Sequence, residues 1–447
     1  MNLSELASVL KVSCTENFDL QGVFIDSRKV QEGSLFVAIK GENFDGHDFI
    51  GQAVEKGAVA VVCERTSDEV PVPQLVVEDS VKELGEIASY HRNQFTCGVI
   101  ALTGSNGKTT VKEMIASILP SPSFATQGNL NNHIGVPLSI LNLRQDHRFG
   151  VFELGANHKG EIAYTVSMVK PKVTLINNIG PAHIEGFGSI EGVADAKGEI
   201  HLGLSKGGTA VVNEDDNFAH YWDACFRDKN QIRFSVEAPL DVYCKRLQMN
   251  PSGCASFTLV TPKGECEINL KVFGKHNVSN ALAAAACTYA LGIGLSDIER
   301  GLNNFTGVSG RMTKRIGRKG SIVIDDTYNA NLRSVLSALY VLAKMKGHRI
   351  LVQGDMGELG DATQAHHQEI GQRASELGID EVYTCGNNSV FTAKGFGANA
   401  QHFVSQAELS KQLIERLDAN TTVLVKGSRA AAMENIVHDL LEPEGMI

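Results

Sequence analysis

The chain has 447 residues, of which 43% are hydrophobic and 21% are charged, the balance of a globular protein with a sizeable core. Domains usually contain about 100–200 residues, so this length corresponds to roughly two to four of them. The formal net charge of −10 argues against a nucleic-acid partner, because proteins that bind polyanions normally carry a basic field. A phosphate group on a ligand would therefore have to be held by a local device.

Neither a membrane span nor a secretion signal is expected. No apolar run approaches the ~18 residues that cross a bilayer. Residues 1–6 lack the basic and apolar regions of a signal peptide, so we expect a cytoplasmic protein without membrane insertion. The nine cysteines include no Cys-x-x-Cys pair, which argues against a zinc site and against a disulfide framework.

Residues 1–80 are predicted to form a small α/β domain. Short apolar runs at 23–25, 35–39 and 58–62 have strand character, and Gly and Asp clusters separate them. The polar segment 78–95 has helical character and is expected to connect this domain to the next one.

Residues 81–308 are predicted to form a central domain around a parallel sheet. Residues 97–102 are continuously apolar, as expected of a strand that is buried on both faces. The apolar positions in 111–119 recur at helical spacing. Further strands are expected at 149–154 and 173–178.

Residues 309–447 are predicted to form a Rossmann-like domain. Four apolar runs alternate with helix-like stretches, which is the pattern of a doubly wound parallel sheet. Polar or Gly-rich loops follow the four runs, so these loops are expected at the sheet edge where such folds bind ligands. The runs are 322–324, 350–352, 382–384 and 423–425, and helices are expected at 332–346 and 365–377. The expected fold class is thus α/β with three domains.

The segment 104–110 has the context of a phosphate-binding loop, because it lies between an apolar strand and an amphipathic helix. Glycines let the backbone wrap closely, the helix N-terminus adds positive potential, and Lys108 adds a full charge. The hydroxyl of Thr109 is suited to ligate Mg²⁺. Leu102 stands where the common motif has its first glycine, so this loop is shorter than usual. We expect ATP on Gly104, Ser105, Asn106, Gly107, Lys108, Thr109 and Thr110.

A nucleotide-bound metal needs a further carboxylate. Glu153 ends the strand expected at 149–154 and is the natural candidate, although an ordinary strand-end glutamate fits the sequence equally well. His183 follows another expected strand, but a lone histidine is more often structural. Lys197 taken alone is a solvated lysine.

Beyond these residues the chain resembles the Mur ligase family, and the resemblance covers essentially its whole length. Three segments are specific: Phe-Asp-Gly-His at 44–47, Tyr-Asn-Ala-Asn at 328–331, and Gly-Asp-Met-Gly-Glu-Leu-Gly at 354–360. They are similar to the member of the family that handles D-alanyl-D-alanine. The other matching segments are 26–28, 33–38, 43–49, 104–110, 128–137, 155–158, 196–200, 274–277, 326–331 and 426–429.

The resemblance implies an activity and three ligand-binding domains. A monomeric enzyme would use ATP to join D-alanyl-D-alanine to UDP-N-acetylmuramoyl-tripeptide through an acyl phosphate, giving the pentapeptide precursor of peptidoglycan. Residues 1–80 would bind the UDP-sugar, 81–308 would bind ATP, and 309–447 would bind the amino substrate. A third domain that closes and excludes water is expected, because an acyl phosphate hydrolyses readily.

The resemblance also implies a site with two Mg²⁺ ions. Lys108 and Thr109 would hold the β- and γ-phosphates and one ion, Glu153 would ligate that ion, and His183 would ligate the second. Lys197 would be carbamylated and would help to position the second ion. A carbamate turns the cation into an anion with two oxygens, which is the ligand type that Mg²⁺ prefers.

Further binding residues are implied for the nucleotide and the substrates. For the nucleotide they are His276, Asn277, Arg311 and Asp326, or Asp325 in place of Asp326. For the uridine diphosphate and the muramoyl part they are Ser27, Arg28, Asn129, Asn131 and Asn132. For the amino substrate they are Tyr328, Asn329 and Arg429, the last as a partner for a free carboxylate, and the loops 354–360 and 426–429 are expected to recognise D-alanyl-D-alanine rather than to be simple turns.

One residue departs from the family pattern. Leu332 stands where the family usually has proline, which would favour the first turn of the next helix, so a looser helix start is expected. The rival enzymes are folylpolyglutamate synthase and the ligase that adds the third amino acid. The segment 354–358 lacks the Asp-Asn-Pro-Arg motif of the latter. A non-catalytic nucleotide sensor would not need Glu153, His183 and Lys197 together.

Overall fold

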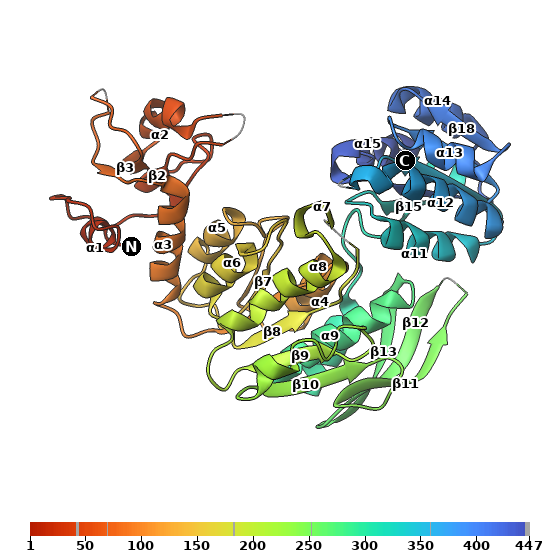
Figure 1. Cartoon of the computed structure of the whole chain (residues 1–447), viewed down its shortest axis with the longest axis horizontal. Coiled ribbons are helices and arrows are strands. Elements are labelled where there is room, and N and C mark those ends of the chain that lie inside the picture. Colours follow the sequence, from red (N-terminus) through yellow and green to blue (C-terminus); the bar gives the residue numbers. More distant parts are fainter. Residues whose placement is uncertain (42–43, 69, 182–183, 252, 358, 443–447) are drawn as a thin grey trace. The chain divides into compact units, whose positions relative to one another are not determined.

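The structure, a computed structural model, describes residues 1–41, 44–68, 70–181, 184–251, 253–357 and 359–442 (Figure 1). The chain divides into two compact units, each assembled from segments that are not contiguous in the sequence. The first consists of Met1–Thr103, Pro120–Thr174 and Gly198–Ala210, and the second of Gly104–Leu119, Leu175–Lys197 and Val211–Ile447.

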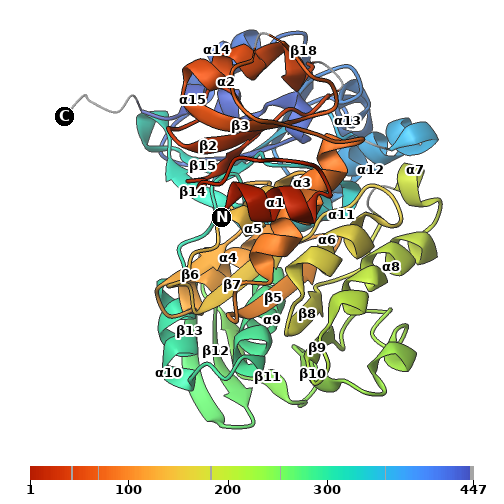
Figure 2. The ribbon, with the colours of Figure 1, turned by 90° about the vertical axis from the view of Figure 1, so that its left-hand side faces the viewer.

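The N-terminal strands form a parallel sheet in the order β1-β2-β3-β4. They confirm the runs expected at 23–25, 35–39 and 58–62. Successive residues of β2 and β3 point to opposite faces, and helices cover both: α1 and α3 pack on one face and α2 on the other (Figure 2). The bounds are β1 Val23–Phe24, β2 Ser34–Val37, β3 Ala58–Cys63, β4 Gln74–Val76, α1 Leu3–Val9, α2 Ile50–Glu55 and α3 Ser80–Arg92.

Helix α3 confirms the polar helix expected at 78–95. It begins after Asp79, whose side chain accepts hydrogen bonds from the backbone N–H groups of Val81 and Lys82. This cap satisfies donors that the first turn of a helix otherwise leaves without an acceptor.

The strand before the phosphate loop is β5 (Gly98–Thr103), and all of its residues except the first are buried. β5 pairs in parallel with β7 (Phe149–Glu153), which pairs in parallel with β6 (Ser123–Ala125). These pairs confirm the parallel sheet expected around 97–102 and 149–154. In this register Leu102 pairs with Glu153, so the glutamate lies beside the end of β5.

The remaining elements of the middle of the chain include strands that the sequence analysis missed. The strands are β8 Val173–Ile176, β9 Thr209–Asn213, β10 Asn230–Ser235, β11 Val242–Met249, β12 Cys254–Thr261 and β13 Gly264–Phe273. The helices are α4 Lys108–Ile118, α5 Gly135–Leu141, α6 Glu161–Val169, α7 Ile184–Phe187, α8 Ile190–Gly198, α9 His276–Ala290 and α10 Leu295–Asn304.

The central sheet is extended by antiparallel strands that the sequence analysis did not predict. β12 pairs antiparallel with both β11 and β13. Along β13, buried Ile268, Leu270 and Val272 alternate with exposed residues. Antiparallel strands tolerate one solvated face in this way, whereas strands of a parallel sheet are usually covered on both faces.

The C-terminal sheet has six strands in the order β14-β15-β19-β16-β17-β18. Its strands are parallel apart from β14, which pairs antiparallel with β15 at one edge, so the expected doubly wound sheet is confirmed with one added edge strand. The bounds are β14 Thr313–Ile316, β15 Ile322–Asp326, β16 His348–Gly354, β17 Glu381–Cys385, β18 Ala400–Phe403, β19 Thr421–Lys426, α11 Leu332–Ala343, α12 Thr363–Glu376, α13 Val390–Phe396, α14 Gln406–Arg416 and α15 Glu434–Leu440.

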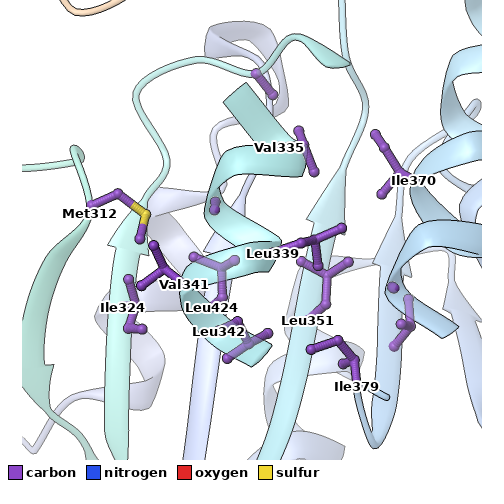
Figure 3. Packing of buried hydrophobic residues seen from close by; sticks show 14 of the residues in the cluster. Met312, Ile324, Val335, Leu339, Val341, Leu342, Leu351, Ile370, Ile379 and Leu424 are labelled. Atoms are coloured by element: carbon purple, nitrogen blue, oxygen red, sulfur yellow. The ribbon is translucent and has the colours of Figure 1, made fainter. Parts of the chain in front are cut away.

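Two apolar layers cover the faces of this sheet. On one face, Leu339 and Leu342 of α11 and Ile370 of α12 pack against Leu351 and Leu424 of the central strands (Figure 3). On the other face, α14 and α15 pack against the alternate residues of the same strands. Burial on both faces explains why these strands read as continuous apolar runs in the sequence.

Helix α11 begins at Leu332 with a complete capping box rather than a loose first turn. The side chain of Asn331 accepts a hydrogen bond from the backbone N–H of Ser334, and the hydroxyl of Ser334 accepts one from the N–H of Asn331. A side-chain cap of this kind typically stabilises a helix start by about 1 kcal/mol, so the proline is not needed to define it.

The cysteines at all nine positions are free thiols. In the part of the chain that the structure describes, no helix is both long enough and apolar enough to cross a membrane.

Glycines bring helices α12 and α13 unusually close together. A Cβ atom at Gly371 would meet the carbonyl oxygen of Thr392, and a Cβ atom at Gly395 would meet the carbonyl oxygen of Gln368. Each helix therefore places a glycine against the backbone of the other.

We expect Gly371→Ala to destabilise the protein by about 1–3 kcal/mol, because the new methyl group overlaps a backbone atom that cannot turn away. Urea denaturation measures the change. Gln372→Ala is the matched control, since it alters the exposed face of the same helix and is expected to change the stability by less than about 0.5 kcal/mol. Equal stabilities for the two variants would contradict the close packing.

Candidate active site

The phosphate loop, residues 104–110, has a backbone conformation at Gly107 that only glycine fits. Gly107 precedes α4 in the left-handed conformation, with φ of 78°. A Cβ atom there would lie 2.7 Å from both Asn177 Nδ2 and Asn280 Oδ1. The loop is therefore wedged against two amide side chains, and its first helical turn presents N–H groups without intrahelical acceptors to a bound anion.

Side chains from the segment after β8 hold the middle of this loop. The N–H of Asn106 donates to Asn178 Oδ1 over 2.9 Å, and the carbonyl of Asn106 accepts from Asn177 Nδ2 at 2.9 Å and from Asn178 Nδ2 at 3.0 Å. The Ser105 hydroxyl donates to the carbonyl of Gly180 and accepts from its N–H, each over 2.9 Å. The backbone of residues 105 and 106 is thus fixed from outside the loop.

Lys108 and Thr109 begin α4, as the sequence predicts. The Nζ of Lys108 donates to the carbonyl of Gly104 over 2.8 Å, so its charge lies along the loop. Thr109 is buried, and its hydroxyl accepts a hydrogen bond from Nη2 of Arg311 over 3.0 Å. Thr110 follows in the same first turn of α4.

Glu153 is a buried carboxylate that is only half satisfied. Asn131 Nδ2 donates to its Oε1 over 2.8 Å, and its backbone N–H donates to the hydroxyl of Thr126 over 3.1 Å. Its Oε2 is buried and has no hydrogen-bond partner among the described residues. A buried carboxylate oxygen without a donor is costly unless a cation meets it, so this residue fits the predicted role of a metal ligand.

Lys197 lies in α8 with a relative exposure of 2%. Burial, and then the charge of Lys108, lowers the pKa of its amine well below the ordinary value. A neutral amine is the form that reacts with carbon dioxide, so the environment fits carbamylation. His183 lies outside the described residues. Among the residues that are described, no three His, Cys, Asp or Glu side chains gather closely enough to hold an ion.

Arg311 and Tyr328 form a stacked pair. The guanidinium carbon of Arg311 lies 4.0 Å from the centre of the Tyr328 ring, within the range of a cation–π contact. The ring therefore supports the side chain that reaches Thr109. The roles predicted for Arg311 in nucleotide binding and for Tyr328 in substrate binding stay predictions.

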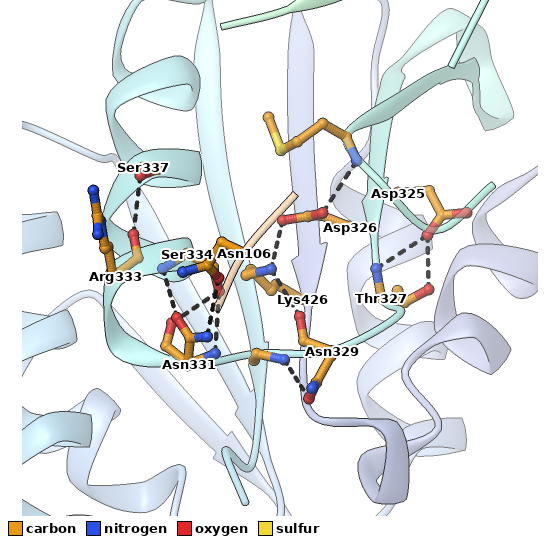
Figure 4. Close-up of polar contacts among 12 residues, drawn as sticks. Asn106, Asp325, Asp326, Thr327, Asn329, Asn331, Arg333, Ser334, Ser337 and Lys426 are labelled. Carbon is orange, nitrogen blue, oxygen red and sulfur yellow. Dashed lines mark hydrogen bonds and ion pairs between the residues drawn. The ribbon is translucent and has the colours of Figure 1, made fainter. Parts of the chain in front are cut away.

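Asp326 and Lys426 form a buried ion pair at the carboxyl ends of β15 and β19. Lys426 Nζ lies 2.6 Å from Asp326 Oδ2 and also donates to the carbonyl of Asn329 over 2.9 Å (Figure 4). Asp325 is engaged differently, since its Oδ1 accepts from the N–H and the hydroxyl of Thr327. Asp326 is engaged on both oxygens as well, since its Oδ1 accepts from the N–H of Met312 over 3.1 Å. The nucleotide contact predicted for Asp326, or for Asp325 in its place, stays a prediction.

The residues predicted near the adenine begin α9. Asn277 donates to the carbonyl of Phe273 over 2.6 Å, and its Oδ1 accepts from Asn280 Nδ2 over 2.9 Å. The ring of His276 lies over Gly274, where a Cβ atom would be 2.5 Å from the ring carbon Cε1. Their contact with a nucleotide stays a prediction.

The residues predicted to bind the UDP-sugar have local partners. The Ser27 hydroxyl donates to Gln52 Oε1 over 2.5 Å, and the exposed Arg28 pairs with Asp26 at 2.9 Å. The side chain of Asn132 accepts a hydrogen bond from the N–H of Gly135, the first residue of α5, over 2.8 Å. Asn129 is exposed. None of these contacts tests the predicted roles.

The loops at 354–360 and 426–429 combine turn chemistry with exposed charge. The carboxylate of Asp355 accepts from the backbone N–H groups of Asn387, Asn388 and Ser389, at 2.7–2.9 Å. This aspartate therefore stabilises the loop at 387–389, which is the role that a simple turn would give it. Arg429 pairs with Glu434 at 2.8 Å, so a substrate carboxylate would have to compete with that side chain.

Sequence reasoning missed four residues that organise the site: Asn177, Asn178, Asn280 and Lys426. The two consecutive asparagines follow the strand β8, which ends at Ile176 rather than at 178 as expected. Adjacent amides at a strand end were the signal that was available. Lys426 was seen only as part of a loop motif, although it is the buried end of β19.

A short phosphate loop between a buried strand and a helix, with a buried carboxylate at the end of the neighbouring strand, defines a P-loop protein of the α/β class. Three Mur ligase family descriptions match the sequence: the family's catalytic domain at 19–92, its middle domain at 102–288, and its glutamate ligase domain at 310–429. The chain belongs to the Mur ligase family.

The relatives are similar to this chain from end to end. The UDP-N-acetylmuramoyl-tripeptide–D-alanyl-D-alanine ligase of Escherichia coli is 43% identical, with 99% of this chain and 98% of that protein covered. A crystal structure of MurF from Acinetobacter baumannii is 38% identical with a TM-score of 0.91, and 98% of each chain is covered. MurF ligase from Thermotoga maritima in complex with ADP is 28% identical with a TM-score of 0.81, covering 94% of this chain and 96% of that one.

We expect Gly107→Ala to abolish nucleotide binding, because the methyl group would displace Asn177 or Asn280 in addition to straining the backbone. Calorimetric titration with ADP measures this. Gly160→Ala is the control: Gly160 also precedes a helix with positive φ, at 92°, but its Cβ would meet nothing within 4 Å. Retained ADP affinity in Gly107→Ala would show that the amides do not constrain the loop.

Proposed function

We propose that this protein is an ATP-dependent ligase that joins D-alanyl-D-alanine to UDP-N-acetylmuramoyl-tripeptide and so forms the pentapeptide precursor of peptidoglycan. The observation that carries the proposal is the full-length similarity to ligases with that substrate pair in their names, at 43% identity for the Escherichia coli protein. The phosphate loop and the half-satisfied Glu153 supply the chemistry that such a reaction requires.

We propose that the three predicted domains divide the substrates among themselves. Residues 1–80 would bind the UDP-sugar, 81–308 would bind ATP, and 309–447 would bind the amino substrate. Support comes from the family descriptions, which change at positions close to these boundaries. The reaction consumes ATP, which cells hold in the cytoplasm, and we place the enzyme there.

The reaction needs positive charge where two anions meet. The terminal carboxylate of the tripeptide would attack the γ-phosphorus of ATP and displace ADP. The amine of the dipeptide would then attack the carbonyl carbon of the acyl phosphate, displace inorganic phosphate and lose a proton. Lys108 and Arg311 are the cations that the described residues bring to the phosphate loop. Their charges offset the repulsion between the carboxylate and the triphosphate.

We propose Mg²⁺ as the metal, with Thr109 and Glu153 as ligands of one ion and His183 and carbamylated Lys197 as ligands of a second. When bound, the ions supply charge stabilisation for phosphoryl transfer. The free Oε2 of Glu153 and the lowered pKa of the Lys197 amine support this assignment.

Phosphate release from ATP tests the proposed function. We expect release only when UDP-N-acetylmuramoyl-tripeptide and D-alanyl-D-alanine are both present, with the pentapeptide product detected by mass spectrometry. Replacement of the dipeptide by L-alanyl-L-alanine is the control for stereochemistry. If no phosphate is released when both natural substrates are present, or if the product is not the pentapeptide, the assignment is wrong.

We expect Lys197→Ala to be nearly inactive and to recover activity with added formate or acetate, because a small carboxylate can replace the carbamate oxygens. Turnover at constant ionic strength, with chloride as the reference anion, measures the recovery. Lys108→Ala is the matched control: it should also lose turnover, but a carboxylate cannot restore a lost cation, so it should not recover. Full activity of Lys197→Ala without rescue would refute the carbamate.

A further inference from the structure

Asn331 makes two kinds of contact with one amide group. Its Oδ1 accepts from the backbone N–H of Ser334 over 2.9 Å and thereby caps α11. Its Nδ2 donates to Oδ1 of Asn106 in the phosphate loop over 3.1 Å (Figure 4). The residue that starts the first helix of the C-terminal sheet is therefore also in contact with the nucleotide loop.

The helix cap determines how this amide is oriented. A backbone N–H needs an acceptor, so the oxygen of the Asn331 amide must face Ser334. The NH₂ group is then left to point at Asn106. Because the cap fixes the rotamer, the contact with Asn106 requires little additional ordering of the side chain.

On the loop side, only the side chain of Asn106 is available for such a contact. Its backbone N–H and carbonyl are taken by Asn177 and Asn178. Asn177 Nδ2 also donates to Asn280 Oδ1 over 3.0 Å, and Asn280 reaches Asn277 at the start of α9. A continuous series of amides thus runs from α9 through the phosphate loop to the cap of α11.

Two guanidinium groups from the same part of the chain reinforce this contact. Arg333, in the first turn of α11, donates to the carbonyl of Ile179 over 3.2 Å, next to the asparagine that holds Asn106. Arg311 donates to the hydroxyl of Thr109. Residues 311–333 therefore place two donors on the loop, from Asn331 and Arg311, and a third, from Arg333, on the segment that holds the loop. A bound triphosphate would attract the two cationic side chains.

We propose that Asn331 is a positioning residue for the ligation reaction, which couples the phosphate loop to the start of α11 through Asn106. The inference rests on the proposed function and adds a residue pair to it. When Asn106 is held in its nucleotide-binding conformation, α11 and the preceding Tyr328 and Asn329 are held in place by the same amide. By linkage, a change on either side of the pair alters the other.

The test compares Asn331→Ser, Asn106→Ala and the double variant in the full-length enzyme. Serine caps a helix as well as asparagine does but is too short to reach Asn106, so Asn331→Ser keeps the cap and removes the coupling. We expect each single variant to lower kcat/KM for ATP by about two- to tenfold, the effect of one net hydrogen bond. The double variant should be no worse than either single variant, because both remove the same contact.

Ser334→Ala is the control for a role limited to the helix start. It removes the other half of the capping box and should lower the melting temperature while leaving kcat/KM for ATP unchanged. Asn331→Ser should lower kcat/KM for ATP and leave the melting temperature unchanged. Multiplicative losses in the double variant, an unchanged kcat/KM in Asn331→Ser, or an equal loss in Ser334→Ala would each overturn the proposal. A wild-type enzyme without ligase activity would instead overturn the proposed function.

Discussion

The side-chain amides of Asn177 and Asn178 form hydrogen bonds with the backbone of Asn106, the central residue of the phosphate loop, and much of the site depends on these bonds. A loop that wraps an anion must turn its N–H groups inward, which leaves the opposite side of the backbone without partners of its own. Here the segment after β8 supplies those partners, and α9 supplies Asn280 behind Gly107. The loop is thus preorganised before a nucleotide arrives, and its charge is provided by Lys108 rather than by the acidic chain as a whole.

Preorganisation also explains how the segment 311–333 can form specific contacts with the loop. Because the backbone of Asn106 does not move freely, its side chain presents a fixed acceptor to Asn331. Arg311 is also held in a fixed position, because the ring of Tyr328 supports its guanidinium where it donates to Thr109. Asn331 is itself oriented by Ser334, and Arg311 by Tyr328, so each side chain that reaches the loop is held by a neighbour on its own side of the contact.

Much of this arrangement was predictable from the sequence. Buried parallel strands are continuous apolar runs, so β5, β7 and the strands of the C-terminal sheet were found, and the Gly-Lys-Thr turn was placed correctly at the start of α4. Strands β11 and β13 were missed because both contain charged residues, and β13 alternates in burial, as a solvated face allows. The alternation of Ile268, Leu270 and Val272 was the available signal.

The parts of the site that escaped prediction depend on contacts between residues distant in sequence. No local pattern shows that Lys426 lies against Asp326, a hundred positions earlier, or that Asn331 faces Asn106. The motif at 328–331 was recognised by resemblance, but the capping box that replaces the family's proline depends on Ser334, outside that motif. His183 lies outside the described residues, so its role in a metal site stays a prediction.

The aspartate at 355 has a consequence for how sequences of this kind can vary. Its carboxylate sits against Gly386, where any Cβ atom would collide with it, and it binds the three N–H groups that follow. Neither Asp355 nor Gly386 can be substituted alone. A side chain at 386 would displace the carboxylate, and loss of the carboxylate would leave the N–H groups of the turn without their acceptor. The two sites, 31 residues apart, are expected to be inherited as a pair, and a chain that has lost one should have rebuilt the whole turn.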